Sequence, residues 1–427
     1  MQNKRGKHSL ESENTHNTNQ SNKRLLLFDL NHFGHHAGYI QYLVEYWKEH
    51  KPPGSLDILV TDTFTKLHQE LVKMGAESES DKINFIAISP EEEALVSAKN
   101  SPLKRALSGF NEWKILCKYA AQLKTTSCLI MYFDSLQFPL FMRLLSPCFL
   151  SGIYFRPVFH YNSFAGFRPT LRERFWQLRD RLFLARILKH PQLKFLFCLD
   201  PFVVEHLGRF EGSVTSLKLP DPINIYEDYQ AKTEHLKKAW KIQPGRKIFL
   251  MFGAYRPRKG IEELLSAIEL LPRESAEKFC LLLVGLIGDE PTVKKRIDNI
   301  KQQLPIKVVS HTDFVPEEEI QSYFQLSDVI LAPYQRHIGM SGILIRAAAA
   351  QKPVLSSSYG LMGEIVKRYS LGIAVDTQIP TKITEGICQF VEKDIQDCGD
   401  ISQMKNFAQQ NMAEKFASTI FNTLNKL

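Results

Sequence analysis

The sequence predicts an α/β protein with two doubly wound domains, each built on a mostly parallel sheet. The chain has 427 residues, which is more than one hydrophobic core usually serves. Short apolar runs alternate with helical stretches, and this alternation occurs twice, on either side of a polar segment with two prolines at 219–230. The content of 44% hydrophobic and 23% charged residues is typical of a soluble globular protein.

The expected strands are short apolar runs bounded by turn residues. In the first half they lie at 24–30, 56–61, 83–88, 127–133, 152–156, 193–199 and 215–220, and in the second half at 247–251, 279–285, 307–310, 328–333, 352–357 and 372–375. In doubly wound sheets, ligands bind at the carboxyl ends of the strands. The sequence divides into a disordered tail (1–22), an N-terminal domain (23–224), a linker (225–240), a C-terminal domain (241–398) and a C-terminal helix (399–427) that packs back on the N-terminal domain.

The first 22 residues are polar and lack the apolar segment of a secretory signal, so we expect a cytoplasmic protein. The seven cysteines show neither a CxxC pair nor metal-ligand spacing. We interpret them as thiols rather than as a disulfide framework.

Basic residues are concentrated in one region of the chain. Residues 101–200 contain 15 Lys and Arg against 5 Asp and Glu, whereas the net charge of the whole chain is +8. Within this region, 168–190 carries apolar residues at helical spacing, namely Leu171, Phe175, Leu178, Leu182 and Ala185. We favour a surface helix that packs this stripe on its own domain, because apolar stripes usually face a core. The alternative is a basic amphipathic helix on an anionic membrane.

Two glycine-containing turns follow strands of the second half. FGAYRPRKG (252–260) places Arg256, Arg258 and Lys259 just ahead of a helix, where unpaired backbone N–H groups and the helix dipole suit a phosphate. We expect Arg256 and Lys259 to add charge and Arg258 to face solvent. A solvated basic turn is the alternative. GMSG (339–342), after the predicted strand in DVILAPY, is a second helix start that could bind an anion. Two such helix starts in one domain favour a diphosphate ligand.

In order and spacing, five segments of the second half resemble the C-terminal domain of the family 4 (group 1) glycosyltransferases of GT-B fold: FGAYRPRKGIEELLSAI, FCLLLVG, VVSHTDFVPEEEIQSYFQLSDVILAPY, SGILIRAAAAQKPVLSS and YGLMGEIVKRYSLGIAV. The resemblance covers about 245–376. It implies two Rossmann-like domains facing a central cleft. It also implies a donor site in which Gly253 and Lys259 lie at the diphosphate. Three sets of residues complete this implied site: backbone amides of Ser341, Gly342 and Ile343 on the phosphates, His337, Gly339 and Met340 at the sugar, and Phe314 and Val315 near the base.

The sequence departs from the family at three positions. Relatives commonly carry one carboxylate near the sugar and a second that binds the ribose hydroxyls. In this sequence the two positions are Ile338 and Arg346. The resemblance therefore places Arg346 among the residues at the donor. Ala254 replaces an arginine that commonly follows the first glycine, and Arg256 lies two residues later, within reach of the same phosphate. We interpret these changes as the mark of a divergent subgroup, and the sequence names neither the donor sugar nor its base.

The N-terminal half resembles the family only in outline. The loop near the reacting sugar corresponds to DLNHFGHHAGYI, with Gly34, His35, His36 and Gly38 as candidates. Its HxxHH pattern has no carboxylate or cysteine nearby, so we expect no metal. His160 matches a position where relatives often place a histidine on the donor sugar, and a packed or capping histidine is the alternative. Asp134 is expected to contact the acceptor or to cap the next helix.

The resemblance implies transfer of a sugar from a nucleotide-diphosphate sugar to an acceptor hydroxyl, with retention of configuration and without metal. Fixed cations and helix amides would stabilise the charge that grows on the leaving diphosphate. The expected acceptor is a glycan or lipid-linked saccharide, the donor is a co-substrate, and no other cofactor is expected. A second hypothesis is a catalytically silent GT-B protein that binds an anionic glycan or an anionic membrane surface. Binding of nucleic acid is a weaker explanation of the basic region, because no recognisable nucleic-acid-binding motif accompanies it.

Overall fold

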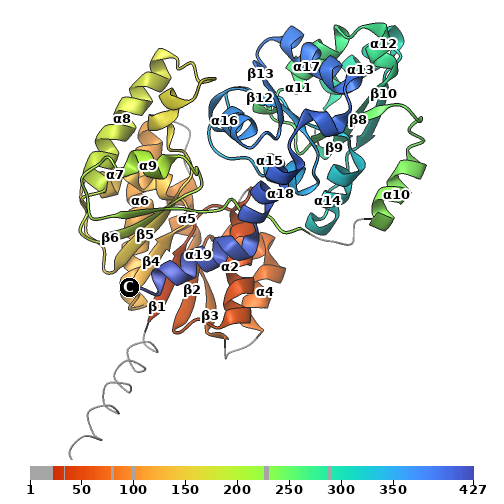
Figure 1. Cartoon of the computed structure of the whole chain (residues 1–427). Helices are drawn as coiled ribbons and strands as arrows, with labels where there is room; N and C mark the ends of the chain where they lie inside the picture. The colour runs from red at the N-terminus through yellow and green to blue at the C-terminus, as the bar shows by residue number, and fades with distance from the viewer. Residues whose placement is uncertain (1–22, 33, 78–80, 98–101, 226–229, 287–289) are drawn as a thin grey trace, which may run out of the picture. The chain divides into compact units, whose positions relative to one another are not determined.

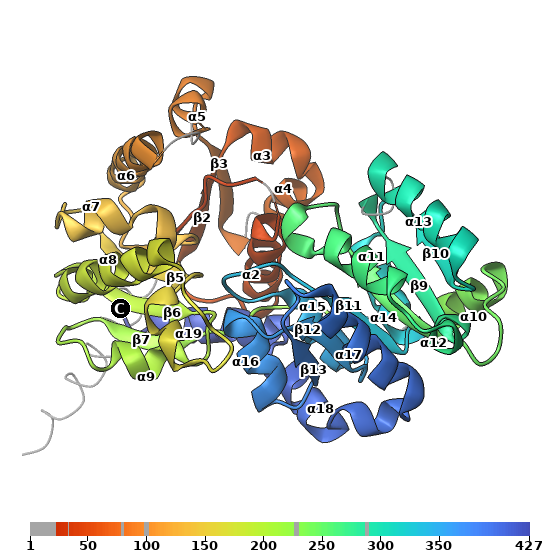
Figure 2. The same cartoon turned by 90° about the horizontal axis from the view of Figure 1, so that it is seen from above.

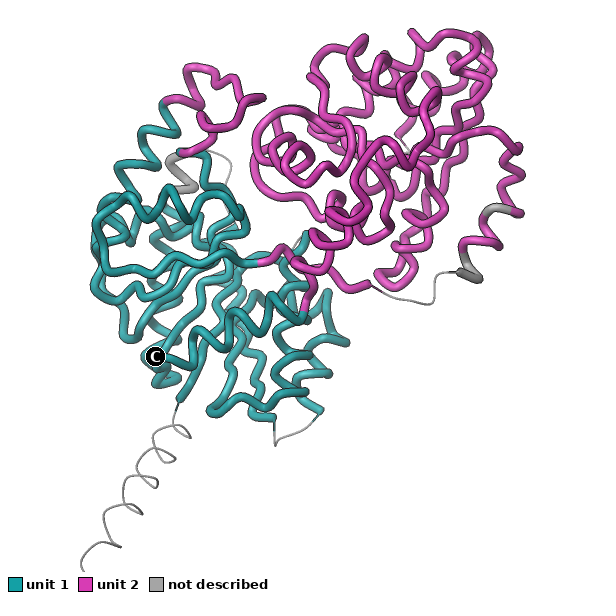
Figure 3. The backbone as a smooth tube through the Cα atoms, viewed as in Figure 1, with its two compact units in different colours: residues 1–159, 175–219, 414–427 teal, residues 160–174, 220–413 magenta. Residues whose placement is uncertain are grey.

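We analysed a computed structural model of the chain, which describes residues 23–32, 34–77, 81–97, 102–225, 230–286 and 290–427. It divides into two compact units (Figure 3): unit 1 comprises residues 1–159, 175–219 and 414–427, and unit 2 comprises 160–174 and 220–413. The tail that was expected to be disordered, 1–22, lies outside the described residues.

Unit 1 is built on a seven-stranded parallel sheet of order β3-β2-β1-β4-β5-β6-β7 (Figure 1). Its strands are β1 (Arg24–Phe28), β2 (Ser55–Val60), β3 (Ile83–Ala87), β4 (Ser127–Ile130), β5 (Phe149–Tyr154), β6 (Leu193–Cys198) and β7 (Thr215–Lys218). The strand order reverses between β1 and β4, which is where ligands bind in such sheets.

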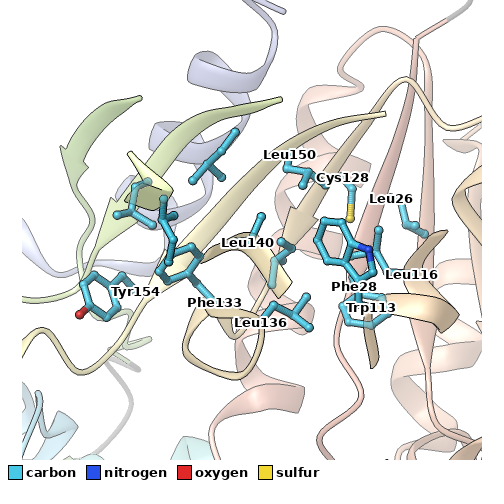
Figure 4. Close-up of a cluster of buried hydrophobic side chains, with 14 of the residues drawn as sticks. Leu26, Phe28, Trp113, Leu116, Cys128, Phe133, Leu136, Leu140, Leu150 and Tyr154 are labelled. Carbon is cyan, nitrogen blue, oxygen red and sulfur yellow. The ribbon is translucent and has the colours of Figure 1, made fainter. Parts of the chain in front are cut away.

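Helices connect these strands and cover the sheet. They are α2 (His36–His50), α3 (Asp62–Leu67), α4 (Gln69–Ala76), α5 (Pro90–Ser97), α6 (Pro102–Gln122), α7 (Gln137–Phe141), α8 (Leu171–Ile187) and α9 (Val203–Leu207), with α19 (Ala413–Leu424) at the end of the chain. Figure 4 shows part of the core between α6, α7 and the strands, with Leu26, Phe28, Trp113, Leu116 and Phe133 among its side chains.

Unit 2 has a six-stranded parallel sheet of order β10-β9-β8-β11-β12-β13 (Figure 2). Its strands are β8 (Lys247–Phe252), β9 (Phe279–Val284), β10 (Lys307–His311), β11 (Val329–Ala332), β12 (Val354–Ser357) and β13 (Gly372–Val375). Its helices are α10 (Gln230–Ala239), α11 (Ile261–Glu269), α12 (Arg273–Glu277), α13 (Pro291–Gln303), α14 (Glu317–Leu326), α15 (Gly342–Ala349), α16 (Gly360–Arg368), α17 (Pro380–Glu392) and α18 (Ile401–Gln410). The strand order reverses between β8 and β11. Every strand expected from the sequence is present, and the predicted fold class is confirmed.

The boundaries of the units differ from those expected in three places. Residues 160–174 belong to unit 2 although they lie in the first half of the chain. Part of the expected linker forms α10, which packs against α14. The C-terminal segment divides, because α18 packs against α15 in unit 2, whereas α19 belongs to unit 1, where Phe416 contacts Tyr39 of α2.

Helix α8 faces the opposite way from the favoured expectation. Leu171, Phe175, Leu178 and Leu182 are exposed by 85%, 66%, 58% and 60%. The side chains on its inward face are Glu173, Gln177, Asp180, Leu184 and Ile187, all buried. The prediction that the apolar stripe packs on its own domain is therefore wrong. In the described residues, no helix is long and apolar enough to span a bilayer.

Candidate active site

Lys259 lies at the end of the turn after β8, and its ammonium reaches back across that turn. Its Nζ donates to the hydroxyl of Tyr334 at 2.7 Å and to the carbonyl oxygen of Phe252 at 3.3 Å. Gly253 (φ +122°) makes room for this side chain, since a Cβ at that position would lie 3.0 Å from Nζ. The half-buried lysine is thus a positioned point charge.

The turns after β8 and β11 are in direct backbone contact. At Gly260 (φ +76°), a Cβ would lie 2.0 Å from the carbonyl oxygen of Pro333, so only glycine fits. The N–H of Gln335 donates to the carbonyl oxygen of Arg258 at 2.8 Å. Because β8 and β11 are also paired neighbours, the two predicted anion-binding segments lie side by side.

The second of these segments begins α15. Ser341 precedes the helix in an extended conformation, and the first N–H groups of a helix have no partner within it and carry its positive dipole end. A Cβ at Gly342 would meet nothing within 4 Å, so the backbone is open there. Ser341 Oγ donates to the hydroxyl of Tyr334 at 3.4 Å. Tyr334 therefore contacts both Lys259 and the start of α15.

The residues predicted at the donor sugar form a short loop between β11 and α15. Gly339 (φ +100°) donates its N–H to the hydroxyl of Tyr161 at 3.3 Å. The two ring nitrogens of His337 lie 3.3 Å from the carbonyl oxygen of Met340 and 3.1 Å from the guanidinium of Arg258. Arg258 is exposed but engaged with His337, so the expectation that it only faces solvent is corrected. Arg256 is exposed on the same turn.

The positions where family carboxylates are missing have distinct surroundings. Ile338 is half-buried, whereas Arg346 is only 9% exposed and forms an ion pair with Glu317 at the start of α14. Within the described residues, Nη1 of Arg346 is buried without a hydrogen-bond partner. A carboxylate therefore does lie beside residue 346, but it belongs to Glu317 of α14. Of the two residues predicted near the base, Phe314 is 88% exposed and Val315 is buried. Direct contact of Arg346 with a donor stays a prediction.

Residues 160–174 meet the Gly339 loop within unit 2. Glu173 accepts hydrogen bonds from the guanidinium of Arg336 and the hydroxyl of Tyr359. Burial would raise the pKa of Glu173, but the bonds from Tyr359, Thr170 and Arg336 outweigh it and lower the pKa. Arg336 adopts φ +43°, directly before His337, so this ion pair fixes the entry to the loop.

His160 is buried at 2% exposure, and its ring packs edge-on against Tyr161 and Phe164 with centroids 5.1 Å away in each case. The structure thus gives the packed arrangement that was the alternative from sequence. Its predicted contact with a donor sugar stays a prediction.

Comparison with known proteins identifies the C-terminal part of the chain. Residues 232–410 match the family model described as "Glycosyl transferases group 1". This region is therefore similar to the group 1 glycosyltransferases. An uncharacterized glycosyltransferase of Methanocaldococcus jannaschii is 26% identical over 186 residues, which cover 43% of this chain and 44% of that protein. The match thus spans less than half the length of this curated relative.

Solved structures resemble this chain over almost its whole length. Sucrose-phosphate synthase from Thermosynechococcus elongatus has a TM-score of 0.62 at 16% identity, covering 95% of this chain and 98% of that one. Anabaena Alr3699/HepE in complex with UDP-glucose has a TM-score of 0.60 at 13% identity, covering 95% and 100%. At such identities the likeness is one of fold, namely two parallel-sheet α/β Rossmann-like domains of GT-B type.

The acceptor-side candidates of the chain come together in unit 1 after β1, β4 and β5. His36 is buried, and its Nδ1 lies 2.7 Å from a carboxylate oxygen of Asp29. The ring of His35 stacks on those of His36 and Phe155, with centroids 4.7 and 5.0 Å away. Desolvation, aided by His36 and Arg156, lowers the pKa of His35 to about 3. The imidazole of His36, held by the buried carboxylate of Asp29, therefore has a fixed orientation.

This cluster corrects the sequence-based view that no carboxylate lies near the histidines, because Asp29 pairs with His36. Gly34 (φ +75°) and Gly38 flank the histidines, and a Cβ at either would meet nothing within 4 Å. Among the described residues, no three His, Cys, Asp or Glu side chains form a group that could hold a metal ion.

Asp134 lies after β4 and holds the backbone that follows β5. Its carboxylate accepts the N–H groups of Phe155 at 2.9 Å and Arg156 at 3.1 Å. Desolvation raises the pKa of Asp134 to about 6, although these amides and Arg156 oppose the shift. The carboxylate therefore does not cap the next helix in the structure, and its predicted contact with the acceptor stays a prediction.

Sequence reasoning missed the residues that support the site. Tyr334, Tyr161 and Glu173 hold Lys259, Gly339 and Arg336 respectively. Tyr334 could have been suspected, since it ends the strand motif DVILAPY. Nothing in the sequence links Tyr161 and Glu173 to residues so distant in the chain.

Proposed function

We propose that this chain transfers a sugar from a nucleotide-diphosphate sugar to an acceptor hydroxyl. One observation carries the proposal: the Lys259 ammonium and the open start of α15 lie at the ends of paired strands, and Tyr334 joins them. A point charge beside unpaired helix amides suits a diphosphate, which offers two charged groups a few ångströms apart.

The same groups would supply the catalysis. As the glycosidic bond breaks, negative charge grows on the leaving diphosphate, and Lys259, Arg256 and the amides of Ser341, Gly342 and Ile343 stabilise that charge. We propose a retaining reaction without metal, in which a phosphate oxygen of the leaving group takes the proton of the acceptor. In this proposal, His160, Gly339 and Met340 contact the donor sugar.

The donor is a nucleotide-diphosphate hexose in this proposal. The structural likeness to Anabaena Alr3699/HepE, solved with UDP-glucose, supports UDP as the first nucleotide to test. The exposed ring of Phe314 offers a surface on which a base could stack, beside the buried Val315. Glu317, held by Arg346, would then face the ribose hydroxyls in place of the missing carboxylate.

The acceptor is proposed to bind at the cluster of His35, His36 and Asp134 in unit 1. A glycan or lipid-linked saccharide would bring its hydroxyl there, which places the reaction in polysaccharide or glycolipid biosynthesis at the cytoplasmic side of a membrane. The stacked rings around Phe155 suit the apolar face of a sugar.

Nucleotide release tests the proposal. The full chain is incubated with a panel of UDP-, GDP- and ADP-sugars, with and without candidate acceptors, and free nucleotide diphosphate is measured. We expect one donor to give acceptor-dependent release, and the same donor to raise the melting temperature by binding only the folded state. No stabilisation and no release across the panel would contradict it.

A second candidate function is favoured by Arg346, which puts a cation where relatives carry a carboxylate. In that case the protein binds an anionic glycan or membrane without catalysis. Stabilisation by a nucleotide with no release of it from any sugar nucleotide would support this candidate.

A further inference from the structure

The outward face of α8 combines apolar and cationic side chains. Its central stripe is formed by Leu171, Phe175, Leu178 and Leu182, each more than half exposed. By the 3.6-residue repeat, Arg172, Arg179 and Arg186 line one flank of this stripe, and Arg174 and Arg181 line the other. We call these nine residues the α8 outer face.

The acidic residues of α8 do not reach that face. Glu173 is buried and bonded to Arg336 and Tyr359, and Asp180 is buried beside Arg179. Gln177, also buried, donates to the carbonyl oxygen of Val158 at 3.0 Å. These polar contacts turn the helix so that its leucines point outward, although burying them would favour the opposite orientation. Every charged side chain of the α8 outer face is therefore an arginine.

Further apolar side chains lie near the end of α8. The turn after α7 carries Met142 and Leu145, exposed by 51% and 68%. The guanidinium of Arg143 donates to the carbonyl oxygen of Lys189 at 3.1 Å, which holds this turn beside the residues that follow α8. Exposed apolar side chains that gather in this way mark an interaction surface rather than a solvated one.

We propose that the α8 outer face docks on an anionic phospholipid membrane. A stripe of leucine and phenylalanine between rows of arginine matches an interfacial helix, whose apolar residues enter the acyl boundary while its cations meet lipid phosphates. A protein partner of ordinary composition would leave several arginines unpaired in a dry interface, whereas lipid head groups pair with them in any register. The inference concerns a surface distinct from the donor site and does not rest on transfer activity.

The test is sedimentation of the full chain with vesicles, without sugar nucleotide or acceptor. We expect binding to vesicles of phosphatidylglycerol and phosphatidylcholine, none to pure phosphatidylcholine, and weaker binding as salt rises. Replacing Arg174, Arg181 and Arg186 together with glutamine should reduce the partition coefficient about a hundredfold, because each cation near an anionic surface contributes about fivefold. Arg179 is left unchanged because it pairs with the buried carboxylate of Asp180. Arg181 and Arg186 donate only to the backbone carbonyl oxygens of Phe159 and Phe141, so the melting temperature of the triple variant is measured alongside its binding.

A second variant tests insertion apart from charge. Phe175→Gln with Leu178→Gln keeps every arginine and should weaken binding roughly tenfold or more. The control replaces three exposed lysines of unit 2, Lys278, Lys295 and Lys301, with glutamine and should bind as the wild type does. Phe175 and Leu178 are both exposed, so this double variant should melt at the wild-type temperature.

Three results would overturn the proposal. One is equal binding to both kinds of vesicle, or to neither. The next is a wild-type chain that ignores vesicles but binds a polyanion such as poly(U) through the three arginines. The last is a wild-type chain that is a dimer in sedimentation velocity and a Phe175→Gln, Leu178→Gln variant that is a monomer. That result would make the α8 outer face an interface between two copies of the chain.

Discussion

Lys259→Ala should abolish most nucleotide binding while leaving the fold in place. In the unliganded chain, Nζ makes hydrogen bonds to Tyr334 and Phe252, and Tyr334 keeps its bond to Ser341 when the lysine is lost. The unliganded variant should therefore lose only about 1 kcal/mol of stability, or about 2–4 °C in melting temperature for a domain of this size. With a diphosphate bound, the ammonium would make a charge-assisted hydrogen bond worth about 1.5–3 kcal/mol.

That difference corresponds to a rise in Kd of about 10- to 150-fold, with a larger loss in the transfer rate because charge grows on the phosphate during reaction. The assay is melting temperature and calorimetric titration against UDP, followed by nucleotide release from the donor that the panel selects. Lys295→Ala removes the same charge from an exposed site on α13 and serves as the control. If Lys259→Ala binds the nucleotide as tightly as Lys295→Ala does, the diphosphate site is elsewhere.

Transfer should survive EDTA, since Lys259, Arg256 and the amides of α15 supply the positive charge; complete loss that Mg²⁺ or Mn²⁺ restores would contradict this. Glu317→Ala should lower the free energy of unfolding by about 1–3 kcal/mol, because it leaves the buried guanidinium of Arg346 unpaired, whereas Glu318→Ala, an exposed neighbour, should change little in urea denaturation. Equal midpoints for the two variants would refute that reading. Asp134 has a folded-state pKa of about 6 against 3.8 unfolded, so its contribution to stability is present below pH 4 and is lost as pH rises through 6. Asp134→Asn should remove this part of the pH dependence, and unchanged slopes would argue against the shift.

The sequence was sufficient to predict the parts of the structure that depend on local pattern. Buried parallel strands are continuous apolar runs, and all of them could be located. The sequence placed the turn of Lys259 and the loop before α15 each after a strand, and the pairing of β8 with β11 in the structure brings the two together. The sequence shows a glycine at position 260, but it could not predict that this glycine lies against the carbonyl oxygen of Pro333.

The parts that could not be predicted depend on contacts distant in sequence. Helix α8 carries two stripes at helical spacing, one of leucine and phenylalanine and one of Glu173, Gln177 and Asp180. Periodicity cannot choose between them. The choice comes from Arg336, Tyr359 and the carbonyl of Val158, which give the polar stripe its partners. The pairing of Asp29 with His36 was overlooked although Asp29 directly follows β1 and His36 begins α2, the next element.

The polar face of α8 also links two parts of the molecule that the sequence keeps apart. Glu173 lies in the first turn of α8, one position before Arg174 of the outer face, and it bonds Arg336, which directly precedes His337 in the loop at the predicted sugar position. Residues 160–174 also supply Tyr161, whose hydroxyl accepts the N–H of Gly339. The start of the proposed membrane helix therefore belongs to the same hydrogen-bonded structure as the loop before α15. Any shift of α8 on a membrane that strains the bond between Glu173 and Arg336 must also change the free energy of that loop. By linkage, a donor that orders the loop would then change membrane affinity by the same factor.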